Sequence, residues 1–377
     1  MTDIQFAGST WDHSRGYDPL VACSREYAQN EGVKINWSKR SLKDFGDASL
    51  TSLSRNYDLL VIDHPHIPLA VSENCLLALD ELVPASELAS IGKTIGEPSY
   101  SSYHYQGKQW AMPVDAATQI AVLRPDLHKR TAPQTWQEVF DMKGVGMALC
   151  PTDAMCSFLS LAAQRAQVKQ MHDGLTFIDE SVGVDILAFL LRLKKVCHPD
   201  GINWNPIDLL DYMSEESDVV YAPLIFGYNN YSRSGFSRHA LSFHDVPMPI
   251  NKHQHSYSAI LGGAGFAISA YCKHPEAAAK FALWLCSEQQ QKGLYFAENG
   301  QPAHIRAWSD ENVNTVAGHF FSNTGKTLAN AWVRPKYPWW PSFQRHVGDV
   351  VNEFLRKPGD ELTVIRHLNH EYAMMIK

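Results

Sequence analysis

The sequence lacks several features that would point at once to a class of protein. No apolar run approaches the roughly 20 residues that cross a bilayer, so no membrane-spanning helix is expected. Basic residues are in deficit, with 33 Lys and Arg against 40 Asp and Glu and a formal net charge of −7. Because a nucleic-acid-binding surface needs surplus positive charge to displace counterions, we expect no nucleic-acid partner.

Cysteine is scarce and follows no pattern. The seven cysteines are an odd number without a CxxC motif, which argues against a disulfide framework and a cysteine zinc site. The N-terminus shows no basic segment followed by an apolar stretch, the pattern of an export signal. The sequence as written therefore predicts a cytoplasmic protein, and a periplasmic one only if a leader precedes it.

The composition that remains is that of a globular protein with more than one domain. The chain has 377 residues, of which 45% are hydrophobic and 19% charged, and domains usually hold about 100–200 residues. Its first part alternates strand and helix: a strand over residues 4–11, a helix from Pro19 closed by Gly32, a second strand over 33–41, a helix over 42–56 and an apolar strand over 57–65. This βαβαβ order predicts a parallel sheet whose strand-end loops line a ligand crevice.

Three later segments carry a family resemblance. They are "QWAMPVDAATQIAVLRPDL" followed by "PQTWQEVF", then "LGGAGFAISAYCKHPEAAAKFALWL", and then "ENGQPAHIRAW". In this order they resemble the sugar-type, family 1 solute-binding proteins of bacterial ABC transporters, at the places where the chain of those proteins passes between two lobes. The sequence departs from that family in showing no export signal and no lipid-attachment cysteine.

The resemblance implies an α/β, two-lobed fold of the periplasmic-binding-protein type (type II). Each lobe would be a mainly parallel sheet flanked by helices, with C-terminal helices packed on the lobes. The implied divisions are 1–112 with 265–310 for lobe one, 116–258 for lobe two, 113–115 and 259–264 for the crossings, and 311–377 for the C-terminal helices. The ligand would lie in the cleft between the lobes.

The loop after the first strand is the first candidate for ligand contact. It holds Trp11, His13, Arg15 and Tyr17. An indole or phenol ring can stack on a sugar ring, and a guanidinium can hold a carboxylate with two hydrogen bonds. The alternative is structural, with Trp11 in the core, Asp12 capping the next helix and His13 on the surface.

Two further candidates follow in the predicted first lobe and at its crossing. Asp63 and His64 come after the apolar third strand. With His66 and His13 they resemble part of a metal site, but no complete ligand set has a recognised spacing, so no metal is expected. Asp115 lies where the chain passes between the lobes, and there it either binds ligand hydroxyls or an amine, or makes a hinge or cap hydrogen bond.

The predicted second lobe adds the loop "IFGYNNYSR". Phe226, Tyr228, Asn229 and Tyr231 supply stacking faces with donors and acceptors, although paired asparagines also serve turns. Ser157 lies near a helix N-terminus, where free N–H groups suit an anionic or carbonyl group.

The returning chain supplies the last candidates. Gly262 and Gly263 permit a close backbone approach at the returning crossing. Gln301, next to the Pro of "ENGQPAHIRAW", is expected to face the cleft from a third crossing.

These residues favour a protein that closes two lobes around a small polar metabolite such as a sugar or sugar acid. We expect no cofactor, a monomer, and an ABC permease partner only if the protein is exported. The alternative is a cytoplasmic enzyme on the same fold, as in thiaminase-like proteins, with acid–base chemistry by His13, Asp63, His64 or Asp115. A nucleophilic Cys150 or Cys156 is the less favoured form of that alternative. A scaffold protein is disfavoured, because aromatic side chains gather at strand ends.

Overall fold

The computed structural model describes residues 4–42, 44, 49–165, 171, 174–215, 217–249 and 257–376. Its first part alternates strands and helices as predicted. The elements are β1 (Gln5–Trp11), α1 (Ser14–Glu31), β2 (Lys34–Arg40), α3 (Leu50–Asn56), β3 (Leu59–Ile62), α4 (Ile67–Ser72), α5 (Ala85–Gly92), α6 (Ser99–Ser102), β4 (His104–Tyr105) and β5 (Lys108–Gln109).

Helix α1 begins five residues earlier than predicted. His13 is its N-cap and accepts a hydrogen bond from the backbone N–H of Arg15, so Pro19 lies inside the helix and not at its start. This side-chain cap satisfies a free N–H group at the helix end. Gly32 ends the helix as predicted, with a φ of +71° that favours glycine. As a result, Arg15 and Tyr17 lie on the first turns of a helix and not in a loop.

The later part of the chain is mainly helical. It contains β6 (Met112–Leu123), α7 (Trp136–Phe140), α8 (Pro151–Arg165), α9 (Glu180–Val196), α10 (Pro206–Ser214), β7 (Tyr221–Phe226), β8 (Ser242–His244), β9 (Leu261–Ile268), α11 (Pro275–Leu285), α12 (Glu288–Lys292), α13 (Leu294–Ala297), α14 (Ile305–Ser309), α15 (Glu311–Val316), α16 (Phe320–Ala329), α17 (Trp340–Arg356) and α18 (Glu361–Ile376). The segment "GVGMALC" (144–150) has the apolar pattern that predicts a strand, but that prediction is wrong, because in this stretch only Val145 forms β-bridges, one to Cys197 and one to Tyr221.

One seven-stranded sheet runs through the molecule in the order β2-β1-β3-β9-β6-β7, with β8 also paired to β6. Strand β1 is parallel to β2 and β3, whereas β9, β6, β7 and β8 pair antiparallel. The second half of the sheet is therefore more antiparallel than the sequence predicted. The reason lies in β6 and β9, which cross the molecule in opposite directions.

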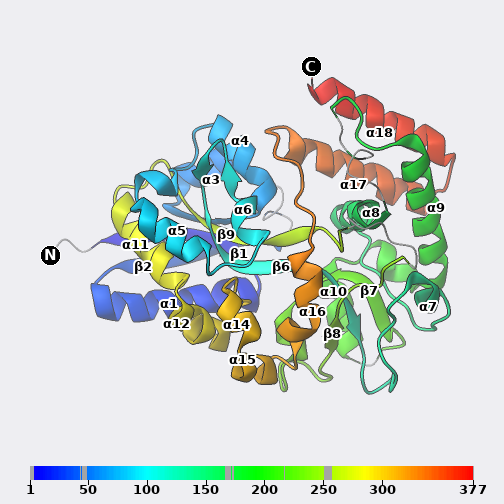
Figure 1. Ribbon diagram of the computed structural model, residues 1–377, viewed down its shortest axis with the longest axis horizontal. Helices are drawn as coiled ribbons and strands as arrows, with labels where there is room; N and C mark the ends of the chain where they lie inside the picture. The colour runs from blue at the N-terminus through cyan, green and yellow to red at the C-terminus, as the bar shows by residue number, and fades with distance from the viewer. Residues whose placement is uncertain are drawn as a thin grey trace.

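Strand β6 links the two halves of the fold. Its first half pairs with β9, from Met112 opposite Phe266 to Thr118 opposite Leu261, and its second half pairs with β7 and β8. All twelve residues of the strand are buried. Figure 1 shows helices α1, α3 to α6 and α11 on one side of this strand and α7 to α10 on the other.

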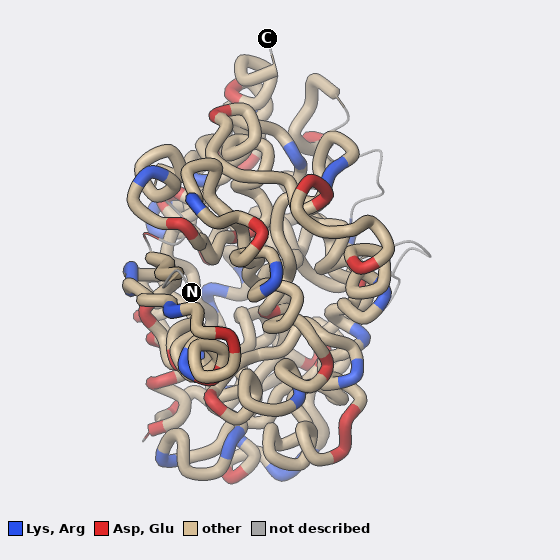
Figure 2. Tube along the Cα trace, turned by 90° about the vertical axis from the view of Figure 1, so that its left-hand side faces the viewer, with Lys and Arg blue, Asp and Glu red and all other residues tan. Residues whose placement is uncertain are grey.

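We call these two groups the first and second lobe, and together they form the two-lobed α/β fold that the sequence predicted. Helices α17 and α18 pack against α8 and α9 of the second lobe. The residue numbers of the lobe boundaries stay a prediction. Lys, Arg, Asp and Glu are interspersed along the chain in Figure 2.

Gly263 is required by the pairing of β6 with β9. It has a φ of +100°, and a Cβ atom there would lie 2.4 Å from the carbonyl oxygen of Asp115. A Cβ on Gly262 would lie 2.5 Å from the ring of Phe226. Both glycines thus allow close packing within the protein, and that explains their presence without a ligand.

Candidate functional site

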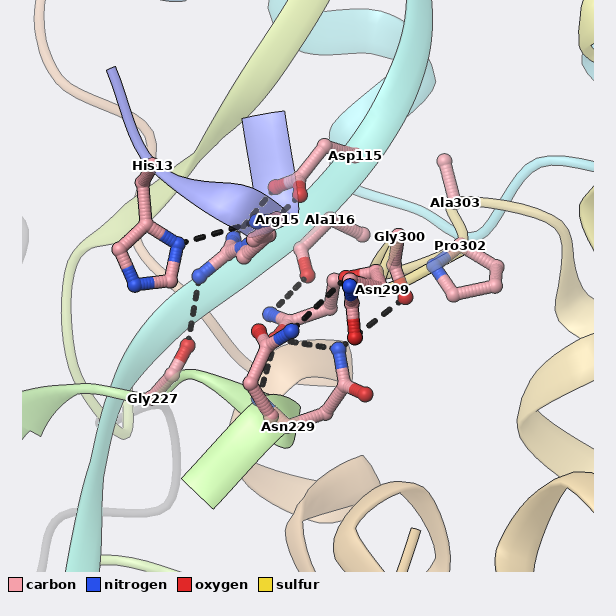
Figure 3. Close-up of polar contacts among 12 residues, drawn as sticks. His13, Arg15, Asp115, Ala116, Gly227, Asn229, Asn299, Gly300, Pro302 and Ala303 are labelled. Carbon is pink, nitrogen blue, oxygen red and sulfur yellow. Dashed lines mark hydrogen bonds and ion pairs between the residues drawn. The ribbon is translucent and has the colours of Figure 1, made fainter. Parts of the chain in front are cut away.

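Arg15 joins the start of α1 to the crossing strand and to the second lobe. Its Nε donates to Asp115 Oδ2 at 2.7 Å and its Nη2 to Asp115 Oδ1 at 2.5 Å. Its Nη1 donates to the carbonyl oxygen of Gly227 at 2.7 Å. Figure 3 shows this guanidinium between the three elements. Two predicted ligand contacts, Arg15 and Asp115, therefore bind each other.

The pair is deeply buried, and this decides its role. Burial alone would lower the pKa of Arg15, but the Asp115 carboxylate outweighs burial, so the pKa of Arg15 is raised overall. Burial raises the pKa of Asp115, while Arg15 opposes that shift. A buried pair with two parallel hydrogen bonds is stable only while both charges remain, because the loss of one leaves the other without compensation. We therefore assign the pair to holding the lobes together.

His13 lies against the tyrosines of the second lobe. Its ring centroid is 4.7 Å from that of Tyr228, in an edge-to-face contact, and 6.4 Å from that of Tyr231. Burial, and then the charge of Arg15, lower the pKa of His13 to about 4, so the ring is neutral at pH 7. The structure therefore brings together the first-strand and "GYNNY" residues that the sequence analysis placed on opposite sides of one site.

The two tyrosines differ in how their hydroxyl groups are used. The Tyr231 hydroxyl donates to Asp211 Oδ1 at 2.5 Å, which fixes it within the second lobe. The Tyr228 hydroxyl makes no hydrogen bond to any residue that the structure describes. Burial raises the pKa of Tyr228 to about 12; Arg15 opposes the shift and Asp115 and Asp153 add to it. Tyr228 is thus a neutral hydroxyl with hydrogen-bonding capacity to spare.

Asn229 and Gln301 bind each other and the backbone around them. The backbone N–H of Asn229 donates to Gln301 Oε1 at 3.0 Å, and Asn229 Nδ2 donates to the carbonyl oxygen of Gly300 at 3.1 Å. Gln301 Nε2 donates to the carbonyl oxygen of Ala116 at 2.9 Å. These contacts, drawn in Figure 3, tie the second lobe to β6 and to the segment before α14. Both amides are satisfied within the protein.

Asp63 and His64 lie at the end of β3, beside the segment that precedes α17. Asp63 Oδ2 forms an ion pair of 2.6 Å with Arg334 Nη2, and its Oδ1 accepts from the backbone N–H of His64 at 2.8 Å. Burial raises the pKa of Asp63, but Arg334 and His64 hold it below its usual value. Asp63 is therefore an anion neutralised by Arg334.

His64 is buried with hydrogen-bonding capacity unused. Its Nδ1 lies 3.1 Å from Asp63 Oδ1 without the geometry of a hydrogen bond, and its Nε2 has no partner among the described residues. Burial lowers the pKa of His64 to about 4, so the ring is neutral at pH 7. A buried polar group without a partner costs free energy, which marks this ring as a candidate for ligand contact.

Asp153 is a buried carboxyl group that was not among the predicted ligand contacts. It is 4% exposed in the first turn of α8, where Cys150 Sγ donates to its Oδ2 at 3.0 Å. Burial raises its pKa to about 7, and the Cys150 hydrogen bond opposes the shift. No cation of the described chain pairs with it. The position of Asp153 in the first turn of a helix could have drawn attention to it, because a carboxylate at a helix start faces the positive end of the helix dipole.

The cysteines do not support a nucleophile. Burial raises the pKa of Cys150 and Cys156 above their usual value, and Asp153 adds to both shifts. A nucleophilic cysteine needs a lowered pKa. The charges that act on Cys156 also include Arg334 and Asp63, so this part of α8 lies near the end of β3.

The remaining predicted contacts have structural surroundings. Trp11 is in the core of the first lobe, and a Cβ on Gly16 would lie 2.2 Å from its ring. Lys39 Nζ lies 4.4 Å above the ring of Tyr17. Ser157 is buried and accepts a long hydrogen bond of 3.5 Å from Gln119 Nε2. Among the described residues, no group of three or more His, Cys, Asp or Glu side chains is arranged to hold a metal ion.

The fold and this interlobe arrangement define a two-lobed ligand-binding protein. Residues 22–303 match the bacterial extracellular solute-binding proteins. The chain belongs to this family and is a solute-binding protein. No curated protein sequence matches it.

Solved structures of sugar- and alditol-bound proteins have the same fold at low sequence identity. Maltose-bound MalE3 of T. maritima superposes with a TM-score of 0.83 at 18% identity, covering 99% of this chain and 100% of that one. A solute-binding protein of Agrobacterium radiobacter K84 in complex with ribitol superposes with a TM-score of 0.81 at 18% sequence identity, covering 99% of this chain and 98% of that one. A solute-binding protein of Thermotoga lettingae TMO bound with α-D-tagatose superposes with a TM-score of 0.81 at 15% identity, covering 99% of this chain and 100% of that one.

The description of the family says where its members are found, but not where this protein is found. It names extracellular proteins, whereas the sequence predicted a cytoplasmic one, and that location is not confirmed. Within the described ranges, no helix is long and apolar enough to cross a membrane.

Proposed function

We propose that this protein binds a small, neutral, hydroxyl-rich compound, a sugar or an alditol, between its two lobes. The ligand contacts would come from groups whose hydrogen-bonding capacity the protein leaves unused: the Tyr228 hydroxyl, the His64 ring and the Asp153 carboxyl. A hydroxyl group can donate to a carboxylate and accept from a phenol or an imidazole. A polyol carries hydroxyl groups that can serve each of these partners.

Charge favours a neutral ligand over a sugar acid. Two arginines near these groups are already neutralised, Arg15 by Asp115 and Arg334 by Asp63. Asp153 has no such partner. An anionic ligand would thus meet the unpaired carboxyl of Asp153, while Arg15 and Arg334 are already paired, and like charges in a buried site repel strongly. This narrows the sequence prediction, which had included sugar acids.

Asp153 is the observation that carries the proposal. A buried carboxyl whose pKa is raised by burial destabilises the fold when it ionises, so its presence calls for a role other than stability. Relatives of the same fold were solved with ribitol, maltose and tagatose, all of them neutral polyhydroxy compounds, and this supports the same ligand class here.

Ligand entry requires the lobes to separate. Contacts such as Arg15 to the Gly227 carbonyl oxygen and His13 to Tyr228 join the two lobes directly. Strands β6 and β9 join the lobes through continuous chain and are the natural hinge. If the protein is exported, an ABC permease would be its partner; the site itself requires only the small molecule.

The experiment is a thermal-shift and calorimetric screen of matched pairs, each an alditol or aldose with its corresponding acid. We expect neutral members to raise the melting temperature, since ligands that bind only the folded state stabilise it, and their acids to bind at least about tenfold more weakly. Chromatography of the recovered ligand should show it unchanged. Equal or stronger binding of the acids would contradict the proposed ligand class, and conversion to product would contradict binding without chemistry.

A further inference from the structure

Two histidines face each other on the C-terminal helix hairpin, on a part of the surface that the ligand site does not use. His346 is on α17 and His367 on α18, and their Nε2 atoms are 3.2 Å apart. The ring centroids are 5.2 Å apart, with the ring planes at 74°. His367 is exposed and His346 half-buried, so ions in solution can reach the pair.

This separation suits two ligands of one metal ion. Two imidazole nitrogens on a tetrahedral zinc ion, each at about 2.05 Å, are roughly 3.3 Å apart. Without a metal ion, the two Nε2 atoms can form a hydrogen bond only if one ring donates and the other accepts. Neutral imidazole is a common ligand of divalent transition metals.

The surroundings hold the two helices together and place two carboxylates beside His346. Packing of Phe343 on α17 against Tyr372 on α18, with ring centroids 5.3 Å apart, fixes the hairpin, and Figure 1 shows the two helices side by side. A hollow of about 340 Å³ next to His346 is lined by two carboxylates, Asp349 and Glu353, and by one lysine, Lys357.

We propose that His346 and His367 form a surface site for one divalent transition metal ion, such as Zn²⁺, that links α17 to α18. The protein supplies two ligands and water completes the coordination, since no third His, Cys, Asp or Glu of the described chain joins the pair. The site is separate from the proposed ligand site and does not depend on it.

The test is calorimetric titration of the full, untagged chain with ZnCl₂. We expect one equivalent to bind and to raise the melting temperature. H346A and H367A should each bind zinc about tenfold or more weakly. Mutation of a residue that only supports a metal ligand typically costs 10–100-fold in metal affinity, and loss of the ligand itself should cost at least the lower end of that range. H370A, one turn further along α18, is the matched control and should bind as the wild type does.

A second measurement separates this site from other histidines of the sequence, including His253 and His255, which lie outside the described residues. Electron paramagnetic resonance of the Cu²⁺ form should show coupling to two ring nitrogens in the wild type and to one in each single variant. No zinc binding, or unchanged affinity in both H346A and H367A, would overturn the proposal.

Discussion

Replacement of Asp153 by asparagine should make the protein more stable at alkaline pH. In the fold, burial raises the pKa of this carboxyl from 3.8 to about 7, against the hydrogen bond from Cys150. Each pKa unit corresponds to ~1.4 kcal/mol, so ionisation of Asp153 in the fold costs about 4 kcal/mol. Asparagine keeps the shape and an oxygen that accepts from Cys150, but it has no proton to lose.

The direction in which stability changes with pH depends on whether the folded or the unfolded state binds the Asp153 proton more tightly. Between about pH 4 and pH 7 the unfolded chain has lost the Asp153 proton while the folded chain keeps it. The folded state binds more protons, so the free energy of unfolding falls as pH rises through this window. Above pH 7 the full cost is present in the wild type and absent from Asp153→Asn.

Urea unfolding of the wild type and of Asp153→Asn at pH 4, 6 and 8 measures this effect. We expect similar stability at pH 4 and a variant more stable by up to about 4 kcal/mol at pH 8. The buried histidines titrate in both proteins, so they cancel in the difference, and the curves at pH 4 are the internal control. A difference that does not grow with pH would refute the account of Asp153 as an unpaired buried carboxyl.

Three further predictions concern the surroundings of the site. Arg15→Ala should destabilise the fold by about 3–5 kcal/mol in denaturant unfolding, because it leaves Asp115 buried without its partner; a loss below 1 kcal/mol would mean that the pair is not buried in solution. His64→Gln should lose less stability than the wild type when the pH is lowered. Burial lowers the pKa of His64 to about 4, so this histidine costs the wild type about 3 kcal/mol of unfolding free energy as pH falls from 6.5 through 4. Parallel curves of unfolding free energy against pH for the two proteins would contradict this. Gly263→Ala should lower the melting temperature through about 1–3 kcal/mol of backbone strain, whereas Gly325→Ala, where a Cβ meets nothing within 4 Å, should not.

The fold was largely predictable because its signals are local or follow in a recognisable order. The apolar strand before Asp63 and the glycine that ends α1 were predicted correctly, and the three later segments correctly indicated the family. The full length of β6 was not predicted, because Asp115, Thr118 and Gln119 look like interruptions of a buried strand. Each is satisfied inside the protein: Asp115 by Arg15, Thr118 by the carbonyl oxygen of Ile260 at 2.8 Å, and Gln119 by Ser160 at 2.6 Å.

The closeness of some predicted residues could be foreseen from the sequence, but their pairing could not. His13, Arg15 and Tyr228 lie together as expected, because polar and aromatic residues at strand ends converge in this kind of sheet; their part in ligand binding stays a prediction. The sequence could not show that Arg15 and Asp115 neutralise each other across a hundred residues. Arg334 was missed for the same reason: it pairs with Asp63 at a separation of 271 residues, and nothing near it in the sequence marks it.

The most direct test of the proposed function is a calorimetric titration of the best neutral ligand from the screen into the wild type, Asp153→Asn and Asp185→Asn. Asp185 is an exposed aspartate on α9 of the same lobe and undergoes the same chemical change. A hydrogen bond to a charged group contributes about 1.5–3 kcal/mol, so Asp153→Asn should weaken binding roughly 10- to 100-fold, with Asp185→Asn unchanged. Equal affinity in all three proteins would contradict the claim that Asp153 holds a hydroxyl group of the ligand between the lobes.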